Sequence, residues 1–200
     1  MNQAKEKPQM IIEIASKLFT RYGYNKTSLE EVAAEAQIAK GTIYYYFSNK
    51  EDLFMSVVDN QANQFIGKLQ NRIESVNGFE NKLKEFLLTP LGLVKDNILV
   101  LMEGINNIPF TYRKRFQSFR EDHRRLMLNM LLEILEIGKQ EGLLALDIPA
   151  KRLADILNDW FITGYRNFSE PDLEVTIKLI ERDHELLTNI ILYGIVKRGI

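Results

Sequence analysis

A short stretch of the chain places amine, hydroxyl and aromatic side chains on one side of a predicted helix. Ile43 and Phe47 are four residues apart, so they share the inner face of a helix of about two turns. The remaining side chains lie on its outer side, and they are Lys40, Gly41, Thr42, Tyr44 and Tyr45. Lysine can pair with phosphate, while hydroxyls and small residues can approach base edges in a major groove. The pattern favours contact with duplex DNA, although any three-helix domain can expose such residues.

Capping motifs predict the helices that surround this stretch. Two overlapping capping boxes, over residues 27–30 and 28–31, predict the start of one helix. A small turn follows over residues 37–40. A third box, over residues 48–51, predicts the start of a long helix with Lys50 beside its first turn. Two short helices joined by a tight turn and followed by a third form a helix-turn-helix layout.

These residues also resemble a known family. Residues 33–36 (AAEA) and 38–53 (IAKGTIYYYFSNKEDL) closely resemble the signature of TetR-family transcriptional regulators, and the pattern over residues 12–24 resembles that family's first helix. Two positions depart from the signature. Gln37 stands where such proteins often carry glycine, and Ala39 stands where a capping serine is common. Both departures bear on the geometry of the turn and the stability of the helix after it.

The resemblance implies an all-α fold in two parts. Residues 1–48 are expected to form a three-helix, helix-turn-helix DNA-binding domain, and residues 49–200 a larger helical domain for effector binding and dimerisation. The rest of the chain agrees, because it carries helical periodicity without an alternating strand pattern or an internal repeat. Gly and Pro positions divide the chain into about nine helices.

The resemblance implies that one half-site of a DNA operator contacts the outer residues of the motif. The expected DNA-binding residues are Thr27, Ser28, Lys40, Gly41, Thr42, Tyr44, Tyr45 and Lys50. Thr27, Ser28 and Lys50 are assigned to phosphates. Thr42 and Tyr45 are the candidates for sequence specificity.

Two apolar stripes near the end of the chain follow helical spacing. Either stripe could be plain intramolecular core, but the family resemblance implies a homodimer with a four-helix interface. The expected interface residues are Leu157, Phe161, Gly164, Phe168, Ile180, His184, Leu187 and Ile191.

Between the motif and these stripes lies a segment rich in methionine and aromatic residues. Most of them are expected to be core, as such residues usually are at helical spacing. The resemblance implies an effector pocket in this part of the chain, for a partly hydrophobic small molecule. The candidate lining residues are Phe86, Met102, Phe116, Phe119, Met127, Met130 and Trp160.

Composition excludes several other functions. The chain has no cysteine, a net charge of −1 and no membrane-length apolar run, so a cytoplasmic protein without thiolate metal sites is expected. Through Lys50 it carries seven Lys and Arg against five acidic residues, which makes the N-terminal part the more basic one. Glu181-x-x-His184 is half of a carboxylate-bridged metal pattern but lacks the other ligands. No catalytic motif is recognisable, and no cofactor or metal is expected.

The favoured function is therefore a ligand-responsive, sequence-specific DNA-binding regulator that acts as a homodimeric repressor on a palindromic operator. Two alternatives stay open. One is a helical ligand-binding or interaction protein without DNA affinity, for which Gln37 and Ala39 are the hints. The other is a helical-bundle metalloenzyme, which metal analysis of the purified protein would identify.

The expected dimer gives a first prediction. A Leu187→Glu substitution would bury an unpaired charge at the interface, so the variant should sediment as a monomer and lose operator binding at the same time. Analytical ultracentrifugation measures the first effect and a DNA-binding titration the second. A Leu187→Glu protein that stays dimeric would remove this interface from consideration.

Overall fold

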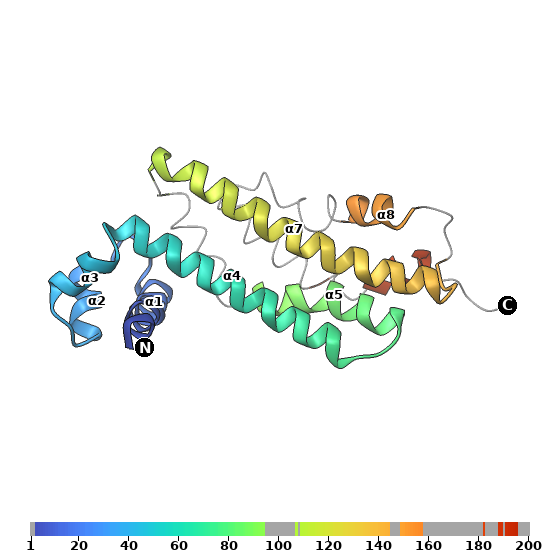
Figure 1. Ribbon diagram of the computed structural model, residues 1–200, viewed down its shortest axis with the longest axis horizontal. Helices are drawn as coiled ribbons and strands as arrows, with labels where there is room; N and C mark the ends of the chain where they lie inside the picture. The colour runs from blue at the N-terminus through green and yellow to red at the C-terminus, as the bar shows by residue number, and fades with distance from the viewer. Residues whose placement is uncertain are drawn as a thin grey trace. The chain divides into compact units, whose positions relative to one another are not determined.

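The computed structural model describes residues 3–94, 107, 109–144, 149–157, 182, 188–189 and 191–195. Every secondary-structure element in these residues is a helix (Figure 1). The expected all-α fold is confirmed for this part of the chain. Seven helices have bounds within the described residues, and residues 188–189 and 191–195 are also helical. None of the described helices is both long and apolar enough to span a bilayer.

Helix boundaries agree closely with the sequence signals in the N-terminal part. The helices are α1 (Gln3–Tyr22), α2 (Leu29–Glu35), α3 (Lys40–Tyr46) and α4 (Lys50–Ser75). Gly23 follows α1 with a φ of 84°, the left-handed conformation that glycine adopts without strain. Pro8 lies inside α1, five residues after its start at Gln3, and it removes one backbone hydrogen bond of the helix.

The later described helices are α5 (Phe79–Val94), α7 (Phe110–Gln140) and α8 (Ala150–Leu157). Helix α5 contains Pro90 and continues through it to Val94. Gly142 follows α7 with a φ of 68°. The N–H of Leu143 bonds the carbonyl of Gly138 and that of Gly142 bonds Lys139, which is a Schellman motif.

The chain divides into two compact units. The first comprises Met1–Gln64 and Asn97–Arg120, and the second comprises Phe65–Asp96 and Glu121–Ile200. The first unit thus contains α1 to α3, the beginning of α4 and the first turns of α7. The boundary predicted at residue 48 stays a prediction.

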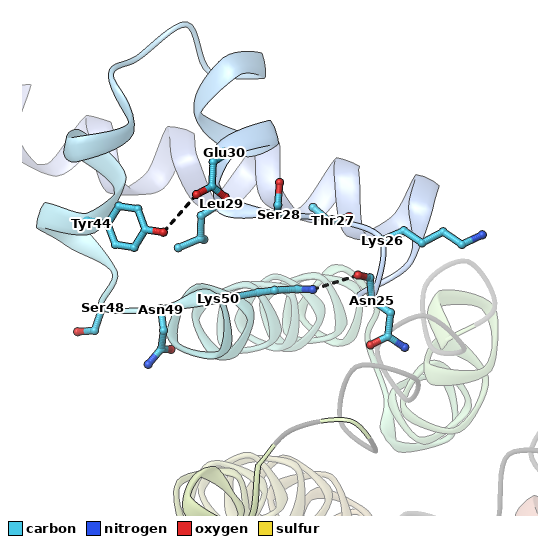
Figure 2. Close-up of a pocket in the computed structure, with 10 residues that line it drawn as sticks. All are labelled: Asn25, Lys26, Thr27, Ser28, Leu29, Glu30, Tyr44, Ser48, Asn49 and Lys50. Atoms are coloured by element: carbon cyan, nitrogen blue, oxygen red, sulfur yellow. Dashed lines mark hydrogen bonds between the residues drawn. The ribbon is translucent and has the colours of Figure 1, made fainter.

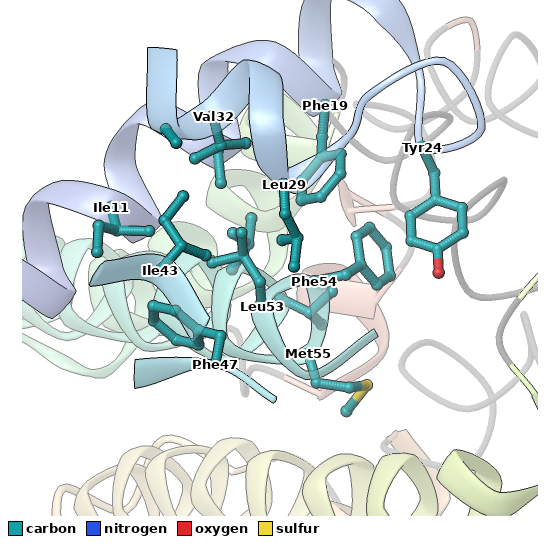
Figure 3. Close-up of a cluster of buried hydrophobic side chains, with 14 residues drawn as sticks. Ile11, Phe19, Tyr24, Leu29, Val32, Ile43, Phe47, Leu53, Phe54 and Met55 are labelled. Atoms are coloured by element: carbon teal, nitrogen blue, oxygen red, sulfur yellow. The ribbon is translucent and has the colours of Figure 1, made fainter. Parts of the chain in front are cut away.

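One hydrophobic core holds the first unit together (Figure 3). Side chains from α1, α2, α3 and α4 meet in it, and at one end the ring of Phe54 packs edge to face against those of Phe19 and Tyr24. The centroids of Phe19 and Phe54 are 5.4 Å apart, and those of Tyr24 and Phe54 are 4.8 Å apart. The buried members are Ile11, Ala15, Phe19, Tyr24, Leu29, Val32, Ala33, Ile43, Phe47, Leu53, Phe54, Met55, Val57 and Val58.

A separate core fills the second unit. Its buried members are Leu69, Ile73, Phe79, Leu83, Phe86, Met127, Leu131, Ile134, Leu135, Ala150, Leu153, Ala154, Leu157 and Ile195. Gly138 of α7 allows a close approach here, because a Cβ at this position would lie 2.7 Å from the fully buried Phe79 ring. The ring of Phe79 has no free end that can move aside, so Gly138 is required by packing and not by backbone conformation.

This contact predicts opposite effects for two Gly→Ala substitutions. Gly138→Ala should destabilise the protein by about 1–3 kcal/mol, because the added methyl overpacks the core. Gly67→Ala is the matched control: Gly67 lies inside α4 with no atom within 4 Å of an added Cβ, so alanine should stabilise the helix by up to about 1 kcal/mol. Urea unfolding of each variant measures the change in its free energy of unfolding. Equal unfolding midpoints would contradict the close contact with Phe79.

Candidate nucleic-acid interface

The capping box predicted over residues 28–31 is present at the start of α2. Ser28 Oγ accepts from the backbone N–H of Glu31 at 3.2 Å, and the backbone N–H of Ser28 donates to Glu31 Oε2 at 2.7 Å. This backbone hydrogen bond holds the pKa of the Glu31 carboxyl below its usual value. Ser28 is therefore fixed at the N-terminus of α2.

The side chain of Thr27 is bonded within the protein. Its side chain is only 3% exposed, and its hydroxyl donates to the carbonyl oxygen of Gly23 at 2.9 Å. The assignment of Thr27 to a phosphate stays a prediction, and its hydroxyl proton is committed to this carbonyl. Thr27 therefore fastens the α1–α2 connection, and the overlapping box over residues 27–30 does not form. Glu30, the other end of that box, turns toward α3 instead.

The turn between α2 and α3 is a Schellman motif built on a non-glycine residue. The N–H of Ile38 bonds the carbonyl of Ala33 at 3.0 Å, and that of Gln37 bonds Ala34 at 3.1 Å. Gln37 consequently has a φ of 54°, in the left-handed region. That conformation costs a residue with a side chain roughly 1–2 kcal/mol, a cost that glycine would avoid. Ile38 packs against the first core and anchors the turn.

Helix α3 has an apolar inner face and a polar outer face. Ile43 and Phe47 are buried in the first core, as predicted. Ala39 is the N-cap and supplies no side-chain hydrogen bond, which is the consequence expected from its departure from the signature. Tyr45 is 81% exposed, more than any other large apolar residue among those that the structure describes, and Gly41 is exposed as well. The outer face of α3 is thus accessible to a partner.

Two outer residues of α3 bind a carboxylate on α2. Lys40 forms an ion pair with Glu30, and the Tyr44 hydroxyl donates to Glu30 Oε1 at 3.4 Å. The hydrogen bond with Lys40 lowers the pKa of Glu30, and the same bond raises the pKa of Lys40. Both groups therefore stay charged at neutral pH.

The start of α4 is capped one residue later than the sequence indicated. Asn49 Oδ1 accepts from the backbone N–H of Asp52 at 2.8 Å, and the backbone N–H of Ser48 donates to Asp52 Oδ2 at 3.3 Å. The predicted partner Glu51 instead accepts from the Tyr24 hydroxyl at 3.2 Å. Burial of that hydroxyl, followed by the nearby Glu51 charge, raises the pKa of Tyr24 well above its usual range.

Lys50 lies between this capping network and the α1–α2 connection. Its ammonium group is 4.2 Å from the centroid of the Tyr24 ring, and it donates to the carbonyl oxygen of Asn25 at 3.4 Å. These contacts hold the amine of Lys50 near the N-terminal ends of α2 and α4 (Figure 2).

A pocket of about 360 Å³ opens where these elements meet (Figure 2). Its lining residues are Asn25, Lys26, Thr27, Ser28, Leu29, Glu30, Tyr44, Ser48, Asn49 and Lys50. Two amines and several hydrogen-bonding groups in one concave surface suit an anionic group such as a phosphate. Of the predicted DNA contacts, Thr27, Ser28, Tyr44 and Lys50 line this pocket, whereas Lys40, Gly41, Thr42 and Tyr45 are not among its lining residues.

Sequence reasoning missed part of this lining, notably Asn25, Lys26 and Ser48. Lys26 and Asn25 were detectable in principle, because they immediately precede the capping box. The position of Glu30 was not, because its partners lie ten and fourteen residues further along the chain.

The first turns of α7 reinforce the start of α4. The Tyr112 hydroxyl donates to Asn49 Oδ1 at 2.9 Å, and Arg115 pairs with Asp52 at 2.5 Å. Both contacts lie within the first unit. They bond to the two residues that cap α4, directly after the chain leaves α3.

The candidate effector residues fall into two groups. Phe116 and Phe119 pack against the first core, whereas Phe86, Met127 and Met130 belong to or pack against the second. Met102 and Trp160 lie outside the described residues. Whether any of them lines an effector site stays a prediction.

Most of the predicted dimer interface lies outside the described residues, namely Phe161, Gly164, Phe168, Ile180, His184 and Leu187. The two described positions are in contact with the chain's own second core. Leu157 is buried in that core and Ile191 packs against it. Their assignment to a dimer interface stays a prediction. No group of three potential metal-ligating side chains occurs among the residues that the structure describes.

Three helices with a shared core, a tight α2–α3 turn and an exposed outer face on α3 define a helix-turn-helix unit. Residues 11–57 match the family model described as bacterial regulatory proteins of the tetR family. Over these residues the chain is similar to TetR-family regulators.

Similar proteins include two curated regulators from Bacillus subtilis strain 168. The uncharacterized HTH-type transcriptional regulator YuxN is 38% identical over 65% of this chain and 46% of its own length. The chain thus spans about half the length of this relative. A fatty acid metabolism regulator protein is 29% identical over 71% of this chain and 73% of its own.

A solved transcriptional regulator from Cytophaga hutchinsonii shares the fold. Its TM-score is 0.72 at 21% identity, and the match covers 96% of this chain and 99% of that one.

The left-handed turn predicts a stabilising substitution. Gln37→Gly should raise the free energy of unfolding by about 1 kcal/mol, because glycine adopts a positive φ without steric cost. Gln37→Ala is the control, since it removes the side chain but keeps a Cβ, and it should leave stability nearly unchanged. Chemical denaturation of the full chain measures both variants. If glycine and alanine behaved alike, the left-handed conformation at residue 37 would be wrong.

Proposed function

We propose that this protein is a ligand-responsive transcriptional regulator that binds a palindromic DNA operator as a homodimer and acts as a repressor. The observation that carries the proposal is the exposed outer face of α3 beside a pocket that holds two amines and the capped ends of α2 and α4. The match of residues 11–57 to the tetR family model supports the same function. The alternative of a helical interaction protein without DNA affinity has no observation that favours it over DNA binding.

The proposed contacts fall into two classes. Ser28 and Lys50, which are fixed beside the pocket, bind phosphates and set the position of the protein on the duplex. Thr42 and Tyr45 on the outer side of α3 read base edges in the major groove, with Gly41 allowing close approach. Thr27 acts indirectly, because its buried hydroxyl holds the connection that carries Ser28.

The proposed effector is a partly hydrophobic small molecule. Phe86 and Met127 are buried in the second core and Met130 packs against it, and aromatic and methionine side chains suit apolar ligands. One similar protein is named a fatty acid metabolism regulator, which is consistent with this chemistry. The proposed dimer uses the apolar stripes near the end of the chain.

A lysine substitution tests the DNA-binding part of the proposal. Lys50→Ala should weaken binding to specific and random duplexes alike, roughly three- to tenfold, and reduce the slope of log K against log salt by about 0.9, the value for one phosphate contact. The probes are a duplex that the wild-type protein selects from a random-sequence library and a duplex of random sequence. Fluorescence anisotropy at several salt concentrations gives affinity and slope.

Lys84→Ala is the matched control, because it removes the same charge from an exposed position on α5 in the second unit. It should leave the salt slope unchanged. Thermal melts should accompany both variants, since Lys50 also contacts Tyr24. A folded Lys50→Ala protein with wild-type affinity and slope would refute the phosphate role, and failure of the wild type to select any duplex would refute DNA recognition.

A further inference from the structure

Three side chains from α2 and α3 form one closed cluster on the surface of the helix-turn-helix unit: Glu30, Lys40 and Tyr44. The ammonium of Lys40 and the hydroxyl of Tyr44 both bind Glu30 Oε1. The Lys40 ammonium also lies 5.7 Å from the centroid of the Tyr44 ring. We refer to these residues as the Glu30 cluster.

The cluster places a negative charge where a DNA-binding surface would ordinarily avoid one. Lys40 lies on α3, and Glu30 and Tyr44 line the pocket beside the ends of α2 and α4. Figure 2 shows the Glu30 carboxylate and the Tyr44 hydroxyl turned toward each other across this region. An incoming phosphate would therefore meet a lysine that already has an anionic partner, together with the charge of that partner.

Folding does not require this arrangement. The side chains of Lys40 and Glu30 are 58% and 50% exposed, and neither contributes to the first core. Ion pairs between such exposed groups add little to stability, because water and salt screen them. The ion pair does, however, determine which charges α3 presents to DNA.

We propose that Glu30 is a specificity-determining residue that withholds Lys40 from phosphates of non-operator DNA. The inference rests on the proposed DNA-binding function. On random DNA, a phosphate must compete with the carboxylate for the same ammonium and gains little. On the operator, a base edge that accepts hydrogen bonds from Lys40, such as guanine O6 and N7, replaces the carboxylate, while the other contacts hold the duplex in place.

The test is Glu30→Gln, which removes the charge and keeps an oxygen that accepts from Tyr44. Its affinity for a duplex of random sequence should rise roughly three- to tenfold, and the salt slope on that duplex should steepen by about 0.9, because Lys40 becomes available for one phosphate. Affinity for the duplex that the wild type selects from a random library should change less. The ratio of the two affinities should therefore fall.

Glu35→Gln is the matched control, because it removes the same charge from an exposed position on the same helix. It should change the affinity ratio much less than Glu30→Gln. A double-substitution cycle with Lys40→Gln then identifies the partner. In a protein that keeps Glu30, Lys40→Gln should scarcely alter the affinity for the random-sequence duplex. In a protein that also carries Glu30→Gln, it should cancel the rise in that affinity.

Three outcomes would overturn the inference. Equal gains from Glu30→Gln and Glu35→Gln would mean that only net charge matters. A Glu30→Gln protein that binds both duplexes more weakly would mean that Glu30 positions Lys40 and Tyr44 for contact. An unchanged affinity ratio in a folded Glu30→Gln protein would leave the cluster without a role in specificity. Failure of the proposed function itself is distinguishable, since the wild type would then select no duplex at all.

Discussion

Helices α2 and α3 have seven residues each, and helices of that length do not persist alone in water. Burial of Leu29, Val32, Ile43 and Phe47 in the first core is therefore the interaction on which the rest of this unit depends. Once those side chains are inside, the direction of every outer residue is fixed by helix geometry. The Schellman turn at Gln37 and the caps at Ser28 and Asn49 then set where each helix begins and ends.

Polar contacts refine what the core establishes. The buried hydroxyl of Thr27 closes the α1–α2 connection, and Tyr24 meets both Glu51 and Lys50 beside it. Tyr112 and Arg115 of α7, which are distant in sequence, bind Asn49 and Asp52 at the start of α4. Segments far apart in the sequence thus build the candidate interface, and hydrogen bonds within the unit hold its amines and hydroxyls in place.

The sequence predicted the elements well because apolar periodicity and caps are local signals. The ends of α2, the start of α4 and the burial of Ile43 and Phe47 follow from residues within a few positions of one another. The sequence could not show which of two adjacent hydroxyl residues caps α2. Ser28 forms the capping box, because the hydroxyl of Thr27 is buried and donates to the carbonyl oxygen of Gly23.

Sequence reasoning could not predict the polar contacts between helices. These contacts depend on how helices cross, which leaves no local sequence pattern. They join Lys40 and Tyr44 to Glu30, and Arg115 to Asp52.

The outer face of α3 has a consequence for how such proteins diverge. Tyr45 and Gly41 add nothing to the buried core, so replacing them does not disturb folding. A duplicated copy of this chain can therefore acquire a new DNA-binding sequence through a few substitutions on the outer face of α3, while the residues of the buried core are kept.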